Sequence, residues 1–476
     1  MNFRVILYAL GGLLRLLGLF MLIPLGVAYY YGESLTPFLI SIFVTIFTGL
    51  LLLYYKTNEE WMRKEGFAIV ALGWLAAAFF GSIPFMLDGI SPLNAVFESM
   101  SGFTTTGSTI LTDIESHPKS ILFWRGLIMW LGGMGIIVLF VAILPKLGVA
   151  GRQIFRAESP GPTEDKLKPR IRETARILWM VYFAISFLQV AALLLAGVSL
   201  YDALNHMFAT MGCGGFSNYS LSVGAFHSSL VEYIITFFTF VAGANFALYY
   251  RAMYVDKGLL FKDEEFRFYT ALILAATGIL TFLLWRDQGT NLLNSFRFAI
   301  FQVVTIMTST GFATTDFNLW SESAKMILII VMFIGACAGS TGGGIKVVRI
   351  LILLKHSRVE LFKALHPKAV KGVKFNSKKV PDEIVNSIVS FVVIYLLVFL
   401  SSSLILSVLG MDIITSITAS IATLGNIGPG LNVVGPMGSF DPIPALGKLV
   451  LIANMWIGRL EVYTVILLFT PEFWRK

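Results

Sequence analysis

The sequence contains few charged residues, few histidines and very little cysteine. Asp, Glu, Lys and Arg together make up 13% of its 476 residues, and the mean hydropathy is +0.79. Ordinary soluble domains carry about a quarter charged residues, so this surface cannot face water on all sides. Cys213 and Cys337 lie in separate regions, which excludes a disulfide framework and a cysteine-based metal site. A soluble enzyme is therefore excluded before any motif is considered.

The sequence also lacks the residue patterns of catalysis. It has no paired carboxylates, no nucleophile beside a base and no phosphate-binding loop, because the glycines at 342–344 follow a hydrophobic helix rather than a strand. Its net charge of +8 is compatible with nucleic-acid binding, but basic cytoplasmic loops explain such an excess better at this hydropathy. We expect no enzymatic activity, no cofactor held by this chain and no nucleic-acid partner.

Long apolar runs dominate the chain. A run of about 20 apolar residues crosses a hydrocarbon core of about 30 Å. The ten candidate crossings are residues 7–30, 36–55, 67–87, 121–145, 177–198, 229–250, 268–285, 324–353, 385–409 and 443–470. Most Lys and Arg residues gather in alternate connections, at 56–64, 146–176, 251–267, 346–379 and 475–476. This asymmetry places both termini in the cytoplasm and predicts an all-α, multi-pass protein of the cytoplasmic (inner) membrane.

Four external connections are too long for turns and too apolar for solvated loops. They are residues 92–106, 201–214, 294–310 and 412–427, and each has the pattern of a short helix followed by an extended piece with glycine. Apolar segments of this length are more often re-entrant than spanning. Irregular backbone at membrane depth persists only where it is buried in protein or lines a water-filled path. Four such segments in one chain predict one shared aqueous path.

The re-entrant segments form an internal repeat. The stretches SGFTTTGST (101–109), TMGCGGFSN (210–218), MTSTGFATT (307–315) and LGNIGPGLN (424–432) align with one glycine of each in register. Each repeat begins on the cytoplasmic side, so the repeats are parallel, unlike the inverted repeats of many transporters. We predict two N-terminal helices plus four parallel helix–pore-loop–helix repeats forming a pseudo-tetrameric pore. The segments are 1–60 (two helices), 61–150, 151–255, 256–365 and 366–476 (repeats 1 to 4).

These glycine segments suit the binding of a desolvated cation. Backbone carbonyl groups supply uncharged oxygens around such an ion, and glycine adopts backbone angles closed to other residues. The short helices also aim their negative C-terminal ends towards the path. A single glycine in a membrane protein usually reflects helix packing, but four in register favour a shared site. The candidate filter residues are Thr105, Thr106, Gly107, Cys213, Gly214, Gly215, Ser309, Thr310, Gly311, Asn426, Ile427 and Gly428.

A glycine run interrupts the predicted span at 324–353. Three consecutive glycines cannot hold a stable helix there, so the run is either a kink that suits helix packing or an unwound loop that obstructs the path. Under the second interpretation the gate residues are Gly339, Ser340, Thr341, Gly342, Gly343 and Gly344.

Arg459 lies in the middle of the last predicted span, two residues before Glu461. Side chains at i and i+2 do not face each other on a helix, so this carboxylate is a poor partner for the arginine. Either carbonyl groups or an acidic group of another helix hold Arg459, or it places a positive charge below the filter and belongs to the gate.

Two further patterns leave alternatives open. The basic segments 151–176 and 355–379 are positive-inside loops, contacts for anionic lipids, or a docking surface for a cytoplasmic partner. His206 aligns with Glu98, Gln302 and Ala419 in the other re-entrant helices. This mixed column favours structural hydrogen bonding over a metal or proton site.

Several motifs resemble the Trk/Ktr/HKT superfamily of potassium transporters. They are GFTTTG, TSTGFATTDF, LGNIGPG, ACAGSTGGGIKVVR and IGRLEVY, and the resemblance covers essentially the whole chain. The two helices before residue 60 make the chain similar to the TrkH branch. The resemblance implies K⁺ as the ion that is bound at the filter residues and transported, a homodimer, and a cytoplasmic ring of nucleotide-binding, TrkA-like regulatory subunits. It also supports a role for Arg459 below the filter.

Two filter positions bear on ion preference. Cys213 departs from the family, which often has Ser or Thr there, and should alter the filter wall only mildly if backbone carbonyls coordinate the ion. Gly107 favours potassium, because sodium-preferring plant relatives have Ser at that position. We therefore expect potassium uptake through a gated pore. The alternative is a potassium symporter coupled to sodium or protons, which needs a buried ionisable relay, and the spans offer few candidates beyond Glu461.

Overall fold

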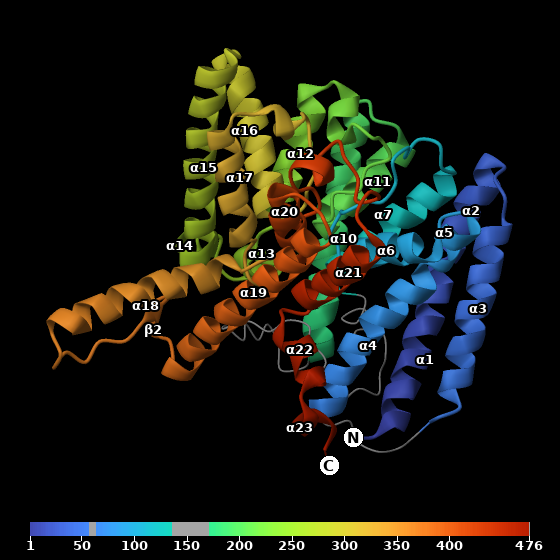
Figure 1. Cartoon of the computed structure of the whole chain (residues 1–476), viewed down its shortest axis with the longest axis horizontal. Coiled ribbons are helices and arrows are strands. Elements are labelled where there is room, and N and C mark those ends of the chain that lie inside the picture. Colours follow the sequence, from blue (N-terminus) through green and yellow to red (C-terminus); the bar gives the residue numbers. More distant parts are fainter. Residues whose placement is uncertain (57–62, 136–170, 476) are drawn as a thin grey trace.

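The computed structural model describes residues 1–56, 63–135 and 171–475. The basic stretch 151–170, the second half of the predicted span 121–145, residues 57–62 of another basic connection, and Lys476 lie outside the described residues. So do the predicted boundaries near residues 60 and 150. The described chain is built almost entirely of helices (Figure 1).

Three helices at the N-terminus form the first unit, and they are α1 (Phe3–Phe20), α2 (Leu22–Tyr31) and α3 (Thr36–Leu53). α1 and α2 together make one apolar stretch, and Gly32, with a φ of 67°, ends α2 before the turn into α3. α1 packs along α3, where a Cβ on Gly11 would lie 2.7 Å from the carbonyl oxygen of Gly49. Small residues allow such close approach of membrane helices. The predicted N-terminal pair of spans matches this unit.

The remaining helices follow one another in a recurring order of long helix, short helix, irregular loop and second helix. The first set comprises α4 (Arg63–Gly81), α5 (Ile83–Leu87), α6 (Pro92–Phe103) and α7 (Lys119–Gly133). The second comprises α10 (Ile171–Leu195), α11 (Leu200–Gly212), the 3-10 turn η1 (Ser222–Phe226), α12 (Ser229–Ala242), α13 (Phe246–Tyr254) and α14 (Leu259–Lys262).

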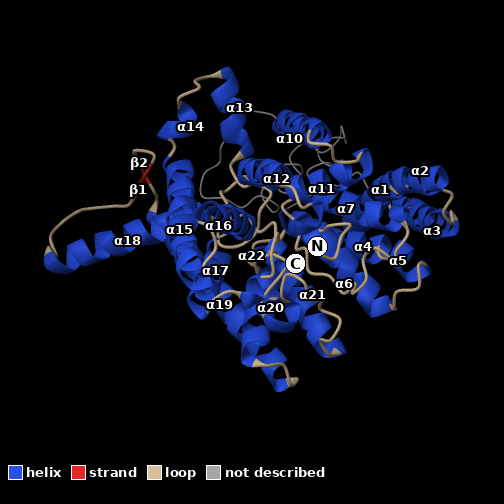
Figure 2. Cartoon of the chain, turned by 90° about the horizontal axis from the view of Figure 1, so that it is seen from above, coloured by secondary structure: helices blue, strands red, loops and turns tan. Residues whose placement is uncertain are grey.

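The third set comprises α15 (Glu264–Gln288), α16 (Leu292–Met307), η2 (Phe317–Leu319), α17 (Glu322–Ile334) and α18 (Val347–Leu365). A small hairpin follows, in which β1 (Lys374–Phe375) pairs antiparallel with β2 (Lys378–Lys379). The fourth set comprises α19 (Asp382–Val408), α20 (Ile413–Leu424), η3 (Asn432–Val434), α21 (Ala445–Arg459), α22 (Tyr463–Ile466), η4 (Leu467–Phe469) and α23 (Pro471–Trp474). α18 extends away from the other helices in both views (Figures 1 and 2).

The second helices differ from the continuous spans that hydropathy predicts. The predicted span 229–250 is bent by 88° between α12 and α13, and the span 443–470 is bent by 113° between α21 and α22. The span 324–353 is divided where α17 ends at Ile334 and α18 begins at Val347. In the described part of the chain, six helices are long and apolar enough to cross a membrane, or eight if each bent pair counts as one span.

The breaks have local causes that an apolar average does not register. The Asn245 side chain accepts a hydrogen bond from the N–H of Ala247 (2.9 Å) and so starts α13 as a new helix. Glu461 and Val462 have positive φ angles of 53° and 63°, and they end α21. Gly335, with a φ of 68°, ends α17.

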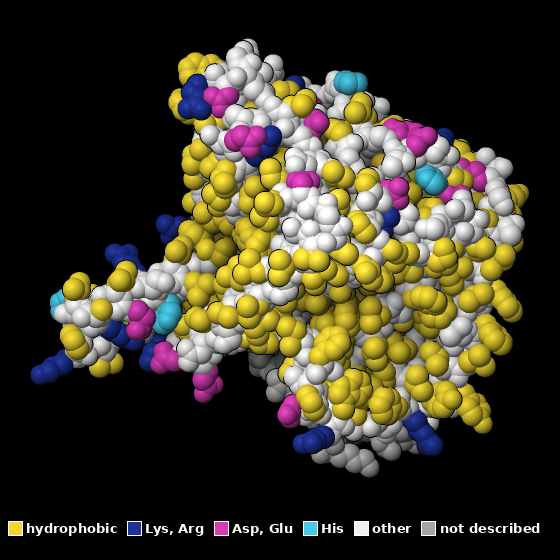
Figure 3. All heavy atoms as spheres, viewed as in Figure 1, with side chains coloured by type: hydrophobic (Ala, Val, Ile, Leu, Met, Phe, Trp, Pro, Cys, Tyr) yellow, Lys and Arg dark blue, Asp and Glu magenta, His cyan; other side chains and the backbone are white. Residues whose placement is uncertain are grey.

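On the face seen in Figure 3, apolar side chains cover a broad middle band, and charged side chains gather above and below this band and on the projecting α18. This distribution suits a protein that crosses a bilayer. The two termini lie close together at one end of the molecule (Figure 1). The N–H of Asn2 donates to the Glu65 carboxylate (2.8 Å), and Lys64 donates to the backbone carbonyl of Arg475 (2.8 Å). Both termini are thus attached to the start of α4.

Candidate ion-binding site

The four short helices α6, α11, α16 and α20 end in the same way. The residue after each last turn has a left-handed conformation with φ between 52° and 57°, and these residues are Thr105, Cys213, Ser309 and Asn426. The N–H that follows bonds the carbonyl five residues back, as from Thr106 to Ser101 (2.8 Å). This is the Schellman closure. A left-handed residue other than glycine costs about 1 kcal/mol, so four equivalent occurrences indicate a backbone shape that the fold requires.

The four aligned glycines lie in one closed ring, which we call the glycine ring. Their φ values are 84° for Gly107, 73° for Gly215, 81° for Gly311 and 106° for Gly428. Each faces a backbone carbonyl of the next segment, and the fourth faces the first. The facing pairs are Gly107 with Gly214, Gly215 with Thr310, Gly311 with Ile427, and Gly428 with Thr106. The structure therefore brings all twelve candidate filter residues together.

Neighbouring segments of this ring approach each other so closely that no side chain fits at the four glycines. A Cβ would lie 2.0–2.1 Å from the facing carbonyl oxygen in the first three pairs and 2.9 Å in the fourth. Real Cβ atoms do not come within 3.0 Å of backbone oxygens without displacement. Glycine is thus required at these positions both by its conformation and by the neighbouring chain.

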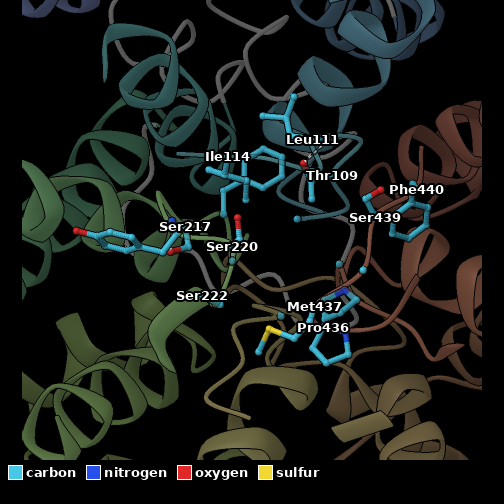
Figure 4. A pocket seen from close by; sticks show the side chains of 18 of the residues that line it. Thr109, Leu111, Ile114, Ser217, Ser220, Ser222, Pro436, Met437, Ser439 and Phe440 are labelled. Atoms are coloured by element: carbon cyan, nitrogen blue, oxygen red, sulfur yellow. Dashed lines mark hydrogen bonds between the residues drawn. The ribbon is translucent and has the colours of Figure 1, made fainter. Parts of the chain in front are cut away.

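A cavity of about 260 Å³ adjoins the glycine ring, and all four of its glycines contribute to the lining. Its wall comes mainly from residues that follow the glycines in the first, second and fourth segments (Figure 4). Hydroxyl-bearing side chains such as Ser217 and Ser439 lie on this wall. The loop 435–440 closes one side and is attached by the N–H of Phe440, which donates to the Thr109 carbonyl (2.8 Å). Sequence reasoning missed this loop, although its glycine and proline content (GPMGS) is a signal for irregular backbone.

A carboxylate lies beside this cavity. Glu115 accepts hydrogen bonds from the Ser220 N–H (2.8 Å) and from the Ser220 hydroxyl (2.5 Å), and Ser220 lines the cavity. Burial alone raises the pKa of the Glu115 carboxyl, but the hydrogen bonds from Ser220 outweigh it, and the pKa lies below its ordinary value. A negative charge is therefore present near the cavity at neutral pH.

An ion pair supports the backbone beyond the first glycine. Glu98 on α6 accepts hydrogen bonds from the Thr109 hydroxyl (2.9 Å) and the Ile110 N–H (3.0 Å). Arg125 on α7 donates to the same carboxylate (2.5 Å) and to the Ser217 carbonyl of the second segment (2.8 Å). Both side chains of the pair are almost fully buried. The ion pair thus links the loops that follow two different glycines.

The residues that align with Glu98 have similar local roles in two other sets. His206 hydrogen-bonds the Ser217 hydroxyl (3.0 Å), and Gln302 donates to the Phe312 carbonyl (3.3 Å). Ala419 has no polar side chain, and the hydroxyl of the preceding Thr418 takes this role by accepting from Leu431 N–H (3.0 Å). These contacts agree with the expected structural hydrogen bonding. Within residues 1–56, 63–135 and 171–475, no group of three or more His, Cys, Asp or Glu side chains is placed to hold a metal ion.

The glycine-rich loop, residues 335–346, lies against three of the four segments. The Thr341 hydroxyl is 3.0 Å from the Cys213 sulfur, and the Gly343 N–H donates to the Ser309 hydroxyl (2.5 Å). A Cβ on Gly343 would lie 3.0 Å from the Asn426 Cβ. The loop therefore touches the left-handed residue of the second, third and fourth segments. Of the predicted gate residues, Thr341 is almost fully buried and Gly339 is exposed.

Arg459 links the remaining segment to this loop. Its Nη1 donates to the Thr105 hydroxyl (2.9 Å) and to the Thr341 carbonyl (2.9 Å). Its Nη2 donates to the carbonyls of Gly132 (2.5 Å) and Gly133 (2.9 Å) at the end of α7. Backbone carbonyls therefore hold the guanidinium, as one interpretation expects, and the guanidinium lies beside the first segment.

Glu461 points to a different helix, as its spacing from Arg459 predicts. Its carboxylate pairs with Arg349 on α18, and the Arg349 guanidinium lies 4.1 Å from the centre of the Phe391 ring. Lys346, immediately before α18, donates to the Gly342 carbonyl. The basic residues at the start of α18 therefore contact the loop and the end of α21.

The second basic segment, 355–379, contains part of α18 and the β1–β2 hairpin. Lys355 pairs with Glu264 and donates to the Lys374 carbonyl (2.9 Å), which attaches the hairpin to α18 and α15. Lys368, Lys371 and Lys378 are exposed. The other basic segment lies mostly outside the described residues.

Known proteins resemble this chain along its whole length. The family model TrkH, described as a cation transport protein, matches residues 35–476. The Trk system potassium uptake proteins TrkH of Halomonas elongata and of Escherichia coli (strain K12) are 39% and 40% identical to the chain over 100% of both proteins. The crystal structure of the potassium transporter TrkH from Vibrio parahaemolyticus superposes with a TM-score of 0.90 at 38% identity, covering 100% of both chains. These findings confirm the resemblance inferred from the motifs, and the names of the relatives are those of transporters, not enzymes. The chain therefore belongs to the TrkH family of cation transport proteins.

Proposed function

We propose that this chain takes up potassium ions across the cytoplasmic membrane through a pore formed within a single chain. The observation that carries the proposal is the closed glycine ring, in which four segments from four helix sets present backbone carbonyls to one another. A ring of carbonyls replaces the hydration shell of K⁺ at no cost in fixed charge. The names of the relatives, which are potassium uptake proteins and a potassium transporter, point to the same ion.

In this proposal the chain is a pseudo-tetramer of four parallel repeats, 61–150, 151–255, 256–365 and 366–476, after a two-helix segment at 1–60. The filter consists of Thr105, Thr106, Gly107 and the nine equivalent residues of the other segments. Equivalent Schellman closures in unlike sequences support a fourfold origin. Cys213 contributes backbone to the ring, and its thiol faces the loop. The Glu115 carboxylate near the cavity favours the entry of cations.

The glycine-rich loop and Arg459 form the gate of this pore, on the cytoplasmic side of the filter. Thr341 and Gly343 contact the left-handed residues of two segments, and Arg459 joins the first segment to the loop. A positive charge at this depth also opposes a cation in a medium of low dielectric constant. Opening then requires that the loop leave the ring and that Arg459 lose at least its bond to Thr341.

The partners of the proposed pore are a second copy of the chain, the lipid bilayer, and a cytoplasmic nucleotide-binding subunit resembling TrkA. The exposed lysines Lys368 and Lys371, which follow α18, and Lys378 of the hairpin form the proposed docking surface for that subunit, with both termini on the same, cytoplasmic side. Charge reversal of Lys368 and Lys371 tests the surface. We expect the double variant to keep basal flux and to lose its response to the subunit, whereas an unchanged response would rule out this surface.

Rubidium uptake by the purified chain in liposomes tests the main proposal. Vesicles loaded with K⁺ should accumulate external ⁸⁶Rb⁺, external K⁺ should compete with the tracer, and equal Na⁺ should compete weakly. Protein-free vesicles are the control for leak. Equal inhibition by Na⁺ and K⁺ would contradict a potassium filter, and no uptake even after removal of the glycine-rich loop would contradict a pore.

A further inference from the structure

A buried glutamate outside the proposed filter contacts both ends of the glycine-rich loop. Glu265 lies in the first turn of α15 and is 5% exposed. Its Oε1 accepts a hydrogen bond from the Ala338 N–H (2.7 Å) and another from the Val348 N–H (3.2 Å). Ala338 precedes the predicted gate residues and Val348 follows them. One oxygen atom therefore joins the entry and the exit of the loop to a helix that is not part of it.

The end of the loop needs such an acceptor. The first N–H groups of a helix have no partner within the helix, and Lys346 at the N-cap of α18 makes no capping bond with its side chain. The Lys346 ammonium instead donates to the Gly342 carbonyl inside the loop. Glu265 supplies the missing cap from α15, because its Oε1 accepts the hydrogen bond from the Val348 N–H in the first turn of α18.

The two ends of the loop also bond to each other, which makes them a neck. The Val347 N–H donates to the Ala336 carbonyl (3.0 Å). On the entry side, the Cys337 N–H donates to the Gly243 carbonyl (3.0 Å) at the break between α12 and α13. These contacts are between backbone groups and do not involve the Glu265 side chain. The side-chain contribution that fixes the neck to α15 comes from the Glu265 carboxylate.

We infer that Glu265 is a positioning residue of the proposed gate, whose carboxylate clamps the neck to α15 and so holds the loop against the glycine ring. This inference rests on the function proposed above. The residues between the two clamped amides include Thr341 and Gly343, which contact Cys213 and Ser309. Loss of the clamp leaves two buried N–H groups without an acceptor in the seated position, so the unseated loop becomes relatively more favourable.

Basal ⁸⁶Rb⁺ uptake of the purified full chain in liposomes measures this effect. We expect Glu265→Ala to raise uptake about ten-fold, which is the order expected when buried N–H groups lose their acceptor in the seated position of the loop. Glu265→Gln should stay near wild type, because the amide oxygen can accept both bonds. Glu264→Gln is the matched control, since Glu264 is the adjacent residue and pairs with Lys355 at the surface.

Two further measurements distinguish positioning of the loop from a general loss of structure. In a chain lacking residues 339–344, Glu265→Ala should add no further uptake. The Cys213 thiol is buried beneath Thr341, so in a Cys337→Ala background Glu265→Ala should speed its alkylation by a cationic thiol reagent applied from the cytoplasmic side. If Glu265→Ala does not yield folded protein, Glu265→Asp replaces it, because the shorter side chain cannot reach both amides.

Wild-type uptake together with wild-type alkylation in the Ala or Asp variant would overturn the clamp. So would an equal rise in uptake in the chain without the loop, because Glu265 would then act elsewhere. If the wild-type and loop-deleted chains both fail to carry selective flux, the proposed function fails instead. The alkylation rate still decides the clamp in that case, because it does not depend on transport.

Discussion

At the scale of single residues, backbone shape rather than side-chain chemistry relates the four segments. Thr105, Cys213, Ser309 and Asn426 share a left-handed conformation, although their side chains differ in size and polarity. Each of these side chains contacts the glycine-rich loop or Arg459. The left-handed backbone conformation of these residues shapes the glycine ring, and their side chains make the contacts with the glycine-rich loop or Arg459.

The glycines of the proposed filter give the most direct prediction at this scale. A Cβ on Gly107 would lie 2.1 Å from the Gly214 carbonyl oxygen, so Gly107→Ser must displace that carbonyl. We expect the K⁺/Na⁺ permeability ratio to fall by about ten-fold, which corresponds to 1.4 kcal/mol of lost discrimination. Competition of K⁺ and Na⁺ with ⁸⁶Rb⁺ uptake measures the ratio. Gly278→Ser is the control, because a Cβ on Gly278 in α15 meets no atom within 4 Å.

The same geometry predicts a graded series. Alanine at Gly215 or Gly311 places its Cβ 2.0 Å from a facing oxygen, whereas alanine at Gly428 leaves 2.9 Å. We expect Gly428→Ala to lose the least selectivity of the four single alanine variants. Two results would show that these contacts do not determine selectivity. One is that Gly428→Ala loses the most selectivity of the series, and the other is that Gly107→Ser keeps the wild-type K⁺/Na⁺ permeability ratio.

Arg459 carries the second prediction. Arg459→Gln removes the positive charge and cannot reproduce four hydrogen bonds to three elements. Charge-assisted hydrogen bonds are worth about 1.5–3 kcal/mol each, so we expect basal flux to rise about ten-fold or more. Arg15→Gln is the control, because Arg15 is an exposed arginine within the apolar helix α1. If flux and apparent K⁺ affinity match wild type in a folded Arg459→Gln chain, the arginine is only a structural link.

At the scale of elements, the sequence predicted one break in a second helix and missed two. Three consecutive glycines at 342–344 disfavour a helix by propensity alone, so the interruption between α17 and α18 could be anticipated. The break at Asn245 has a local signal, since asparagine is a favoured N-cap residue, but hydropathy does not register it. The break at Glu461 accompanies a contact that a local pattern does not contain. Asn245 caps a new helix, and Glu461 pairs with Arg349 from a distant part of the chain. Periodicity and hydropathy report apolar length, which a bend leaves unchanged.

The glycine-rich loop is the element on which gating is best tested. A Cβ on Gly342 would lie 2.6 Å from the Thr308 carbonyl oxygen, and one on Gly343 would lie 2.4 Å from that of Gly425. Replacing Gly342, Gly343 and Gly344 together by alanine should therefore unseat the loop and raise basal ⁸⁶Rb⁺ uptake about ten-fold, if the clash costs at least 1.4 kcal/mol. Removing residues 339–344 should raise uptake at least as much.

A matched glycine outside the loop provides the control for these variants. Gly26→Ala lies in α2, where a Cβ meets no atom within 4 Å, and should leave uptake at the wild-type level. Wild-type uptake in both loop variants, with and without the proposed regulatory subunit, would mean that the glycines only form a kink that suits helix packing. The variants must insert and keep the wild-type oligomeric state for this comparison to count.

At the scale of the whole molecule, the sequence predicts that the four glycine segments come together, but it does not predict the order in which they meet. Register of the glycines predicts that four segments have equivalent roles. The order in which they meet, with Gly107 against the second segment and Gly428 back against the first, follows only from the packing of all the helices. The loop 435–440 beside the cavity and the clamp at Glu265 were missed for the same reason. Both depend on contacts between residues far apart in the chain.

The last prediction concerns the whole molecule and distinguishes a pore from a coupled symporter. A symporter needs an ionisable relay that changes state during transport. Glu98 is paired with Arg125, Glu461 with Arg349, and Glu265 accepts two backbone bonds, so these three acids have structural partners. We therefore expect uptake to follow the membrane potential alone. A potential of 100 mV is worth about 2.3 kcal/mol per charge, or about fifty-fold accumulation of K⁺ at equilibrium.

The measurement uses liposomes in which an ion gradient sets a known membrane potential. No valinomycin is added, and ⁸⁶Rb⁺ is the tracer. Accumulation should stop near the ratio set by the potential, and imposing an inward Na⁺ or proton gradient at constant potential should not change that ratio. Coupling would be established if either gradient drove ⁸⁶Rb⁺ accumulation above the ratio set by the potential. If Glu461→Gln abolished this extra accumulation, the relay would be at Glu461. A gradient effect that persists in Glu461→Gln would place it elsewhere, and the pore mechanism would be wrong in either case.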